Sequence, residues 1–174
     1  VTDSQPTPDT DDQALSLTVT TTTIVTFQDD LNGYTGTRDT WMTEDDPDAN
    51  GGTTDIAHLQ YPTQDRQLHK FDLSSIPTGS TVNSATISFY VMDLISGTPD
   101  VGCYRVITQW DEMQATYNSR LTGTPWGTPG MLAGTDYDAT PVGTNNVTGT
   151  GWVSFNATSL VQGWVSNSYA NEGV

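Results

Sequence analysis

The sequence has few positively charged residues. It contains 5 Lys and Arg against 21 Asp and Glu in 174 residues, which gives a formal net charge of −16 at pH 7. Nucleic acids and anionic membranes attract proteins through clustered Lys and Arg. The composition therefore predicts no nucleic-acid partner. It favours marine, halophilic or calcium-rich extracellular settings, in which surplus carboxylates hold water and divalent cations.

Cysteine, histidine and long apolar runs are also scarce. The one cysteine, Cys103, has no partner for a disulfide within the chain, and its apolar neighbours favour a small core residue over a nucleophile. The sequence has no run of about 18 apolar residues, so it predicts no membrane insertion. His58 and His69 lack a triad context, and the adjacent Asp111 and Glu112 would point to opposite faces of a strand. We therefore predict that the protein is not an enzyme and requires no cofactor.

Residues of strand character dominate the rest of the chain. In the segment 85–91, Ile87 and Phe89 share one face with alternating polar residues on the other, which is the period of a half-buried strand. A turn at 76–80 contains Pro and Gly and separates this strand from an earlier one. The Thr-rich segment 15–27 is β-branched and also favours strands. These patterns predict an all-β fold.

A helical pattern occurs near the end of the chain. Within 157–165, Leu160 and Trp164 share a helical face, and Asn156 is suited to cap the helix. We predict one short helix there, and long loops in the Gly-, Thr- and Pro-rich segment 119–150. The residues predicted to form the core are Phe71, Leu73, Ile87, Phe89, Val91, Cys103, Trp110, Trp152, Phe155, Leu160 and Trp164.

The chain length suits one domain. Residues 1–12 are rich in Pro, Asp and Thr and predict a flexible acidic lead-in. Residues 13–174 then predict a single domain with its own core.

An acidic loop offers candidate metal ligands. Asp45, Asp46, Asp48 and Asn50 occur close together in a Gly-containing segment, and Ca²⁺ takes roughly six to eight oxygen ligands from such clusters. The spacing does not match an EF-hand loop. The segment therefore predicts either a Ca²⁺ site or an ordinary solvated turn.

Sugar binding requires an exposed aromatic face and planar polar groups. Several aromatic residues lie in predicted loops, and an acidic polysaccharide would need several cations on one face because one exposed ion pair contributes only about 1 kcal/mol. The candidate ligand-binding residues are Trp41, Trp126, Tyr137, Arg38, Arg66 and Arg120.

Several short segments follow one another in a recognisable order. They are Asp39-Thr40-Trp41-Met42 with 47–52, Lys70-Phe71-Asp72-Leu73-Ser74-Ser75-Ile76-Pro77, 82–91, Trp110-Asp111-Glu112 with Ala115-Thr116-Tyr117-Asn118, Leu160-Val161-Gln162-Gly163-Trp164, and Asn171-Glu172-Gly173. Over residues 39–174 this order resembles the DNRLRE domain family, part of which is classed as a carbohydrate-binding module that recognises alginate. The string that names the family is absent. The resemblance implies an antiparallel β-sandwich of the jelly-roll type in a secreted or surface protein.

The resemblance also implies a sandwich without its final strands, because the family normally continues beyond the segment that ends here at Val174. An unpaired sheet edge is costly. The Thr-rich segment 15–27 of the same or a neighbouring chain is the predicted donor of the missing strand, since strand addition to an exposed edge is a general mode of assembly.

Two functions from different classes fit the sequence. The first is a non-catalytic extracellular module that is a structural or adhesive subunit of a filament, adhesin or virion, with copies of itself or other subunits as partners. The alternative is a carbohydrate-binding module for a neutral or acidic polysaccharide, attached to a secreted polysaccharide-degrading enzyme. The shortage of cations and the Thr-rich segment favour the first. Asn146 and Asn156 begin sequons, which matter only where the source attaches glycans.

Overall fold

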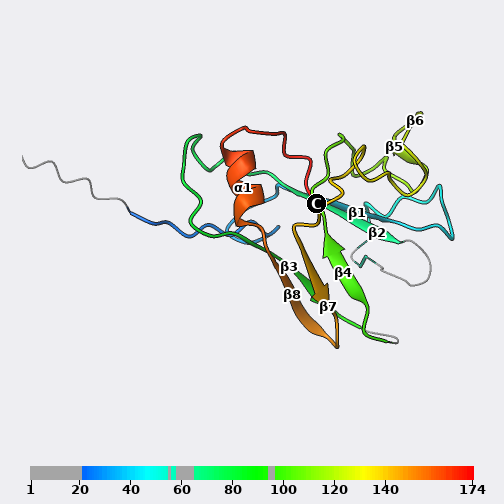
Figure 1. Ribbon diagram of the computed structural model, residues 1–174, viewed down its shortest axis with the longest axis horizontal. Helices are drawn as coiled ribbons and strands as arrows, with labels where there is room; N and C mark the ends of the chain where they lie inside the picture. The colour runs from blue at the N-terminus through cyan, green and yellow to red at the C-terminus, as the bar shows by residue number, and fades with distance from the viewer. Residues whose placement is uncertain (1–20, 55, 58–64, 94–96) are drawn as a thin grey trace, which may run out of the picture.

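The computed structural model describes residues 21–54, 56–57, 65–93 and 97–174, within which the chain forms short strands and one helix (Figure 1). The elements are β1 (Thr37–Met42), β2 (Arg66–Phe71), β3 (Thr86–Val91), β4 (Asp100–Cys103), β5 (Ser119–Leu121), β6 (Thr124–Pro125), β7 (Gly143–Asn146), β8 (Gly151–Asn156) and α1 (Thr158–Val165). The predicted all-β class and the short helix are confirmed. No helix in the described ranges is long and apolar enough to cross a membrane.

The described strands pair antiparallel, as β1 with β2, β3 with β8, β4 with β7, and β5 with β6. The β7 strand lies beside β8, where Asn145 Nδ2 donates a hydrogen bond of 2.7 Å to the carbonyl of Ser154. The strands β3, β8, β7 and β4 therefore run side by side in the lower part of Figure 1. The closing of two sheets into a jelly-roll sandwich stays a prediction.

The predicted turn between β2 and β3 is present. The amide of Ile76 donates to Leu73 O at 2.9 Å, and the amide of Ser80 donates to Pro77 O at 3.1 Å. Gly79 has a φ of 87°, which glycine adopts without a steric cost. The two strands that this turn joins pair with different partners, so the chain leaves one pair and enters another here.

The apolar side chains form two clusters. The first lies between β1, β2 and the loops of 106–131, and its members are Met42, Leu68, Val106, Trp110, Ala115, Tyr117, Trp126 and Met131. The second lies between β3, β4, β8 and α1, and its buried members are Ile87, Cys103, Phe155, Ala157, Leu160, Trp164 and Val174, with Phe71, Leu73 and Phe89 packed against them. Helix α1 covers the second cluster because Leu160 and Trp164 lie on one helical face.

Trp152 is not a core residue, and this prediction is wrong. Its side chain is 66% exposed. Val153 and Phe155 of the same strand face the second cluster, so the strand period of two places residue 152 on the opposite face. Val91, also predicted in the core, is half-buried and belongs to neither cluster.

The segment 171–174 lies between β2 and the residues after β4. The backbones of His69 and Val174 exchange two hydrogen bonds of 2.8 Å, and the Val106 amide donates to Gly173 O at 2.9 Å. Val174 is 8% exposed and belongs to the second cluster, while Val106 belongs to the first. This segment therefore ties the two clusters together.

The residues 21–27 form no strand within the chain. Ile24 is 91% exposed and Val25 is 51% exposed. The expected strand over this part of the segment 15–27 is therefore not formed here. Residues 15–20 and the predicted lead-in 1–12 lie outside the described residues, and strand exchange with a neighbour stays a prediction.

Candidate functional site

The outward face of the β3–β8 pair presents a row of exposed aromatic and polar side chains. The register places Tyr90 opposite Trp152, with two further cross-strand pairs below them. We name this surface the outer strip, and it consists of Thr86, Ser88, Tyr90, Trp152, Ser154 and Asn156, all of them exposed. From Thr86 to Tyr90 the strip extends about 13 Å, at roughly 3.3 Å per residue of strand. It is long enough to contact an oligosaccharide rather than a single sugar.

An aromatic pair forms one end of the outer strip. Trp152 is 66% and Tyr90 is 57% exposed, and their ring centroids lie 5.3 Å apart with planes at 77°. The sequence has five tryptophans, all of which the structure describes, and Trp152 is the exposed one. Large exposed aromatic side chains lose water contact on binding and therefore mark interaction surfaces.

Polar groups with fixed positions continue the outer strip. Ser88 Oγ and Ser154 Oγ lie 2.8 Å apart across the two strands. Asn156 Oδ1 accepts hydrogen bonds from the backbone amide and the hydroxyl of Thr158, at 3.0 and 2.8 Å. The prediction that Asn156 is the N-cap of α1 is wrong, because Ala157 is the N-cap and the helix has no side-chain cap. Asn156 precedes the cap and is held by its local turn with Thr158. The strip combines apolar ring faces with hydroxyl and amide groups held by the sheet.

Two of the tryptophans matter for the predicted ligand-binding set. Trp126 is 3% exposed, and its indole N–H donates to Thr116 O at 2.8 Å, so the prediction that it is accessible is wrong. The loop uses it as an anchor in the first cluster. Trp41 lies in β1 rather than in a loop and is half-buried; its indole N–H donates to Thr54 Oγ1 at 2.8 Å. The backbone of Gly51 packs on its ring, where an added Cβ would lie 2.3 Å from Cδ1.

Tyr137 and Arg66 lie together, away from the outer strip. Tyr137 packs against the first cluster. Its ring makes an edge contact with Tyr104, at a centroid distance of 5.3 Å and an angle of 74°. The Arg66 guanidinium carbon lies 5.3 Å from the centroid of the same ring. The aromatic ring of Tyr137 is therefore engaged within the protein.

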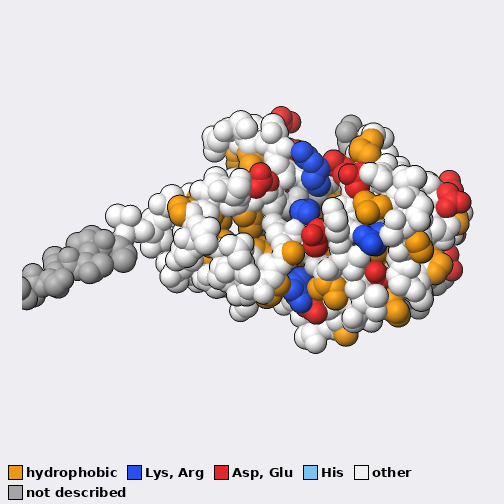
Figure 2. Space-filling view, turned by 90° about the horizontal axis from the view of Figure 1, so that it is seen from above, with side chains coloured by type: hydrophobic (Ala, Val, Ile, Leu, Met, Phe, Trp, Pro, Cys, Tyr) orange, Lys and Arg blue, Asp and Glu red, His pale blue; other side chains and the backbone are white. Residues whose placement is uncertain are grey.

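The cations near the middle of the molecule lie beside carboxylates. Arg38 Nε is 3.7 Å from Glu112 Oε2, and Lys70 Nζ is 2.9 Å from Glu172 Oε2. Arg38 and Lys70 line a shallow hollow that also contains Asp72. Figure 2 shows Lys and Arg side chains interspersed with Asp and Glu side chains on one face of the molecule. The hollow is therefore not a cationic surface.

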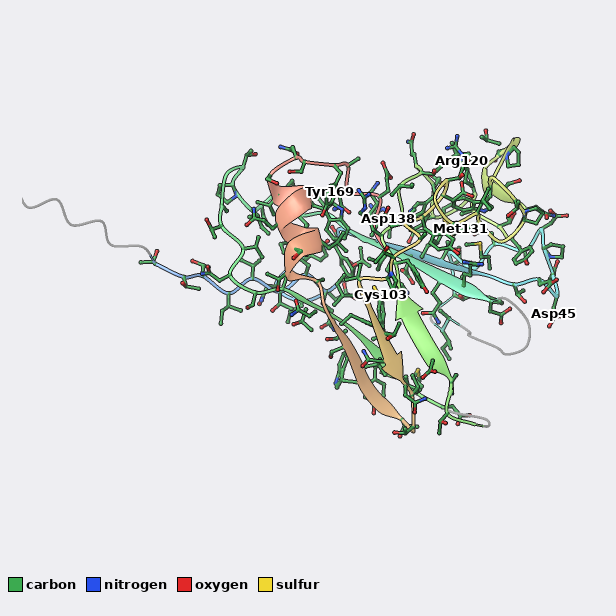
Figure 3. All side chains as sticks on the ribbon, viewed as in Figure 1. Asp45, Cys103, Arg120, Met131, Asp138 and Tyr169 are labelled. Carbon is green, nitrogen blue, oxygen red and sulfur yellow. The ribbon has the colours of Figure 1, made fainter. Side chains whose placement is uncertain are left out.

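A second shallow hollow next to α1 has the same character. Arg105 Nε is 2.7 Å from Asp138 Oδ2, and its guanidinium carbon lies 4.2 Å from the ring centroid of Tyr169. All three line the hollow, and Figure 3 shows Asp138 and Tyr169 close to each other there. Arg120 lies in β5, apart from this hollow in Figure 3, and its Nη1 donates to Gln109 O at 2.9 Å.

Some polar side chains of the acidic loop form hydrogen bonds with other parts of the protein. Asn50 Nδ2 donates to Glu112 O at 2.8 Å and to Ala115 O at 2.7 Å. Asp48 Oδ1 accepts from Asn118 Nδ2 at 2.9 Å, and Asp45 points outward at the edge of the molecule (Figure 3). Within the part of the chain that the structure describes, no three Asp, Glu, His or Cys side chains form a group that could hold a metal ion. Calcium binding by Asp45, Asp46, Asp48 and Asn50 stays a prediction from the sequence.

Cys103 is buried, His69 and Asp39 are half-buried, and the surroundings of each shift its pKa. Desolvation lowers the pKa of His69 to about 4, so this imidazole is neutral at pH 7 beside the ring of Phe89, at a centroid distance of 4.5 Å. Burial raises the pKa of the Cys103 thiol to about 12, which keeps it protonated. Burial and the nearby Glu112 raise the pKa of Asp39. His58 lies outside the described residues.

The described strands pair antiparallel, and the outward face of the β3–β8 pair is exposed, aromatic and polar, which defines the chain as an all-β module. The model of carbohydrate-binding module family 96 matches residues 32–172, and the chain belongs to this family. No curated protein and no solved structure gives a match. The family match supports the predicted kinship with carbohydrate-binding modules, while the DNRLRE name stays a prediction. It favours the alternative function over the structural or adhesive subunit.

The outer strip could have been found in part from the sequence. Strict alternation over 151–156 places Trp152 and Ser154 opposite Val153 and Phe155, and the same rule places Tyr90 outward. The apolar residues next to Trp152 in the sequence favoured a core position instead, which led to the wrong prediction for this residue. The pairing of β3 with β8 joins residues that lie 60 (Val91 and Gly151) to 70 (Thr86 and Asn156) positions apart in sequence, and no local pattern encodes it.

Proposed function

We propose that this chain is a non-catalytic carbohydrate-binding module that binds a polysaccharide on the outer strip. The observation that carries the proposal is the exposed pair of Tyr90 and Trp152 beside a row of hydroxyl and amide groups. The family match over residues 32–172 supports the same class of ligand.

The geometry suits the two kinds of contact that sugars make. The C–H face of a pyranose ring is apolar and packs on the face of Trp152, while its hydroxyls reach polar groups such as Ser88 and Ser154. Each sugar hydroxyl both donates and accepts, and so do the serine hydroxyls. The strip is open to solvent, so we expect many weak contacts along a chain rather than deep enclosure of one sugar.

The module is proposed to act as part of a secreted protein, attached to an enzyme that degrades the same polysaccharide. Binding by the module would keep a catalytic domain close to its substrate and raise its effective concentration there. In this arrangement the module contributes affinity, and the chemistry belongs to the attached enzyme.

The test is a comparison of Trp152→Ala and Tyr90→Ala with the unaltered protein by affinity electrophoresis in gels that contain a panel of polysaccharides. Loss of the aromatic ring should weaken binding by about tenfold to a hundredfold, or roughly 1.5–3 kcal/mol. Met113→Ala is the matched control, because Met113 is another exposed apolar residue, 55% exposed, outside the strip. Equal retardation of all four proteins in every gel would refute the outer strip as the binding site.

A further inference from the structure

We propose that the outer strip is selective for single soluble chains of uncharged sugars, and that it discriminates against anionic polysaccharides and crystalline surfaces. This inference rests on the proposed function and names the substrate class of the same site. Three observations carry it: the charge of the strip, the state of the cations, and the angle between the two aromatic rings.

The outer strip contains no Asp, Glu, Lys, Arg or His side chain. The first charged residue after β3 is acidic, namely Asp93. The whole chain has a formal charge of −16. A polyanion such as a uronic acid polymer would approach against this field and meet no compensating cation on the strip.

The cations elsewhere do not provide a second surface for a polyanion. Arg38, Lys70 and Arg105 each lie within 4 Å of a carboxylate, at 3.7, 2.9 and 2.7 Å. Each pair is partly exposed to solvent, and solvent-accessible pairs are individually weak, so an anion could displace the protein carboxylate. The displaced Glu or Asp would then remain beside the incoming anion, and the net repulsion would persist. The Arg66 and Arg120 guanidiniums contact a tyrosine ring and a backbone carbonyl.

The angle between the two aromatic rings indicates whether the ligand is a flat crystalline surface or a free chain. A flat crystalline polysaccharide presents many sugar faces in one plane and requires coplanar aromatic rings. The planes of Tyr90 and Trp152 are inclined at 77°. One ring therefore stacks on a sugar face while the other flanks the edge of that sugar or of its neighbour. This arrangement fits a chain that is free in solution, because such a chain can bend to contact both of the inclined rings.

The experiment measures binding of the intact chain to three classes of probe by isothermal titration calorimetry and pull-down. The neutral soluble probes are galactomannan, arabinoxylan and mixed-linkage β-glucan; the anionic probes are alginate and polygalacturonate; the insoluble probe is microcrystalline cellulose. We expect at least one neutral soluble probe to bind about tenfold or more tightly than either anionic probe. Its affinity should change less than about twofold as salt rises from about 0.05 to 0.5 M, because no charge pair forms.

Two variants separate this inference from the proposed function. Trp152→Ala should lose about tenfold or more in affinity for the neutral probe, while Arg38→Ala should not change it. Preferred binding of alginate or polygalacturonate, weakened by salt and by Arg38→Ala, would overturn the selectivity and move the site to the hollow that Arg38 and Lys70 line. If alginate binding is lost instead in Trp152→Ala, the strip is the site and only the selectivity is wrong.

The remaining outcomes are also decisive. Retention on microcrystalline cellulose as strong as on the soluble probes would overturn the inference about the physical form of the ligand. An affinity for a neutral probe that Trp152→Ala and Tyr90→Ala leave unchanged, or no binding to any probe, would overturn the proposed function itself. Circular dichroism and thermal melting of each variant confirm that it is folded, which is expected because both aromatic side chains are exposed.

Discussion

Tyr90 and Trp152 lie directly opposite each other on β3 and β8 and meet edge to face on the solvent side of the sheet, with centroids 5.3 Å apart. A cross-strand aromatic pair usually stabilises a sheet by covering apolar surface. Here Tyr90 is 57% exposed and Trp152 is 66% exposed. The pair therefore contributes little burial to the folded state and leaves most of its surface for a ligand.

The two aromatic rings should be energetically coupled. A double-mutant cycle with Tyr90→Ala and Trp152→Ala should give a coupling free energy of about 0.5–1.5 kcal/mol, because the edge-to-face contact exists only when both rings are present. Urea unfolding followed by far-ultraviolet circular dichroism measures the four free energies. Strict additivity would show that the rings do not meet in solution.

The stability of the fold should depend on the amide protons of Asn50. In Asn50→Asp the Nδ2 donor to Glu112 O and Ala115 O is replaced by an oxygen that faces two carbonyls, which should lower the free energy of unfolding by about 1–3 kcal/mol. Asp45→Asn is the control, because Asp45 is exposed, and it should change stability by no more than about 0.5 kcal/mol.

The same variants test the calcium prediction. Thermal melting with calcium and with a chelator should give the same order of stability if Asn50 acts through its hydrogen bonds alone. A melting temperature of Asn50→Asp that rises above that of the unaltered protein on addition of calcium would show that the loop binds the ion, since a carboxylate is the stronger ligand.

Gly173 and Gly79 form a matched pair of glycines with left-handed backbone. Gly173 has a φ of 83°, and an added Cβ would lie 2.1 Å from His69 O, a backbone atom. Gly79 has a φ of 87° with nothing within 4 Å of an added Cβ. Gly79→Ala should therefore cost about 1–2 kcal/mol of strain alone, whereas Gly173→Ala adds the displacement of β2 and should cost roughly 3 kcal/mol or more. Equal unfolding midpoints for the two variants would argue that 171–174 does not dock on His69.

His69 should make stability depend on pH in the acid range. Its folded pKa is about 4 against an ordinary value of 6.5, so between these values the unfolded chain binds more protons than the folded one. Stability is therefore present above about pH 6.5 and is lost as pH falls towards 4. Acidification to pH 5 should therefore lower the free energy of unfolding by about 1–2 kcal/mol. This figure is discounted because the His69 side chain is only partly buried.

The variant His69→Phe keeps an aromatic ring beside Phe89 and removes the titration. Its unfolding free energy should fall less than that of the unaltered protein between about pH 7.5 and 5. The comparison of the two proteins is needed because Asp39, whose pKa is raised by burial and then by Glu112, works in the opposite direction and loses stability as pH rises. Parallel pH profiles for the two proteins would contradict the role of His69.

Much of the fold could be predicted from local patterns. The alternation of Ile87 and Phe89 predicts β3, and the shared face of Leu160 and Trp164 predicts α1, because burial of one face is a local property of the sequence. The turn with Gly79 is equally local, since only its own φ angle requires glycine. The Thr-rich segment has strand propensity, yet residues 21–27 form no strand because propensity without a pairing partner does not stabilise a strand.

The sequence by itself determined the all-β class, the position of the helix and the excess of negative charge, because each depends on residue types and their spacing. Only the tertiary structure decided which aromatic residues face water. Trp126 and Trp152 both occur beside glycine in the sequence, but one anchors a loop in the first cluster and the other stands on the outer strip. The physical reason is that exposure depends on which distant segment covers a side chain, and the pairing of β3 with β8 is a contact between residues that no local pattern connects.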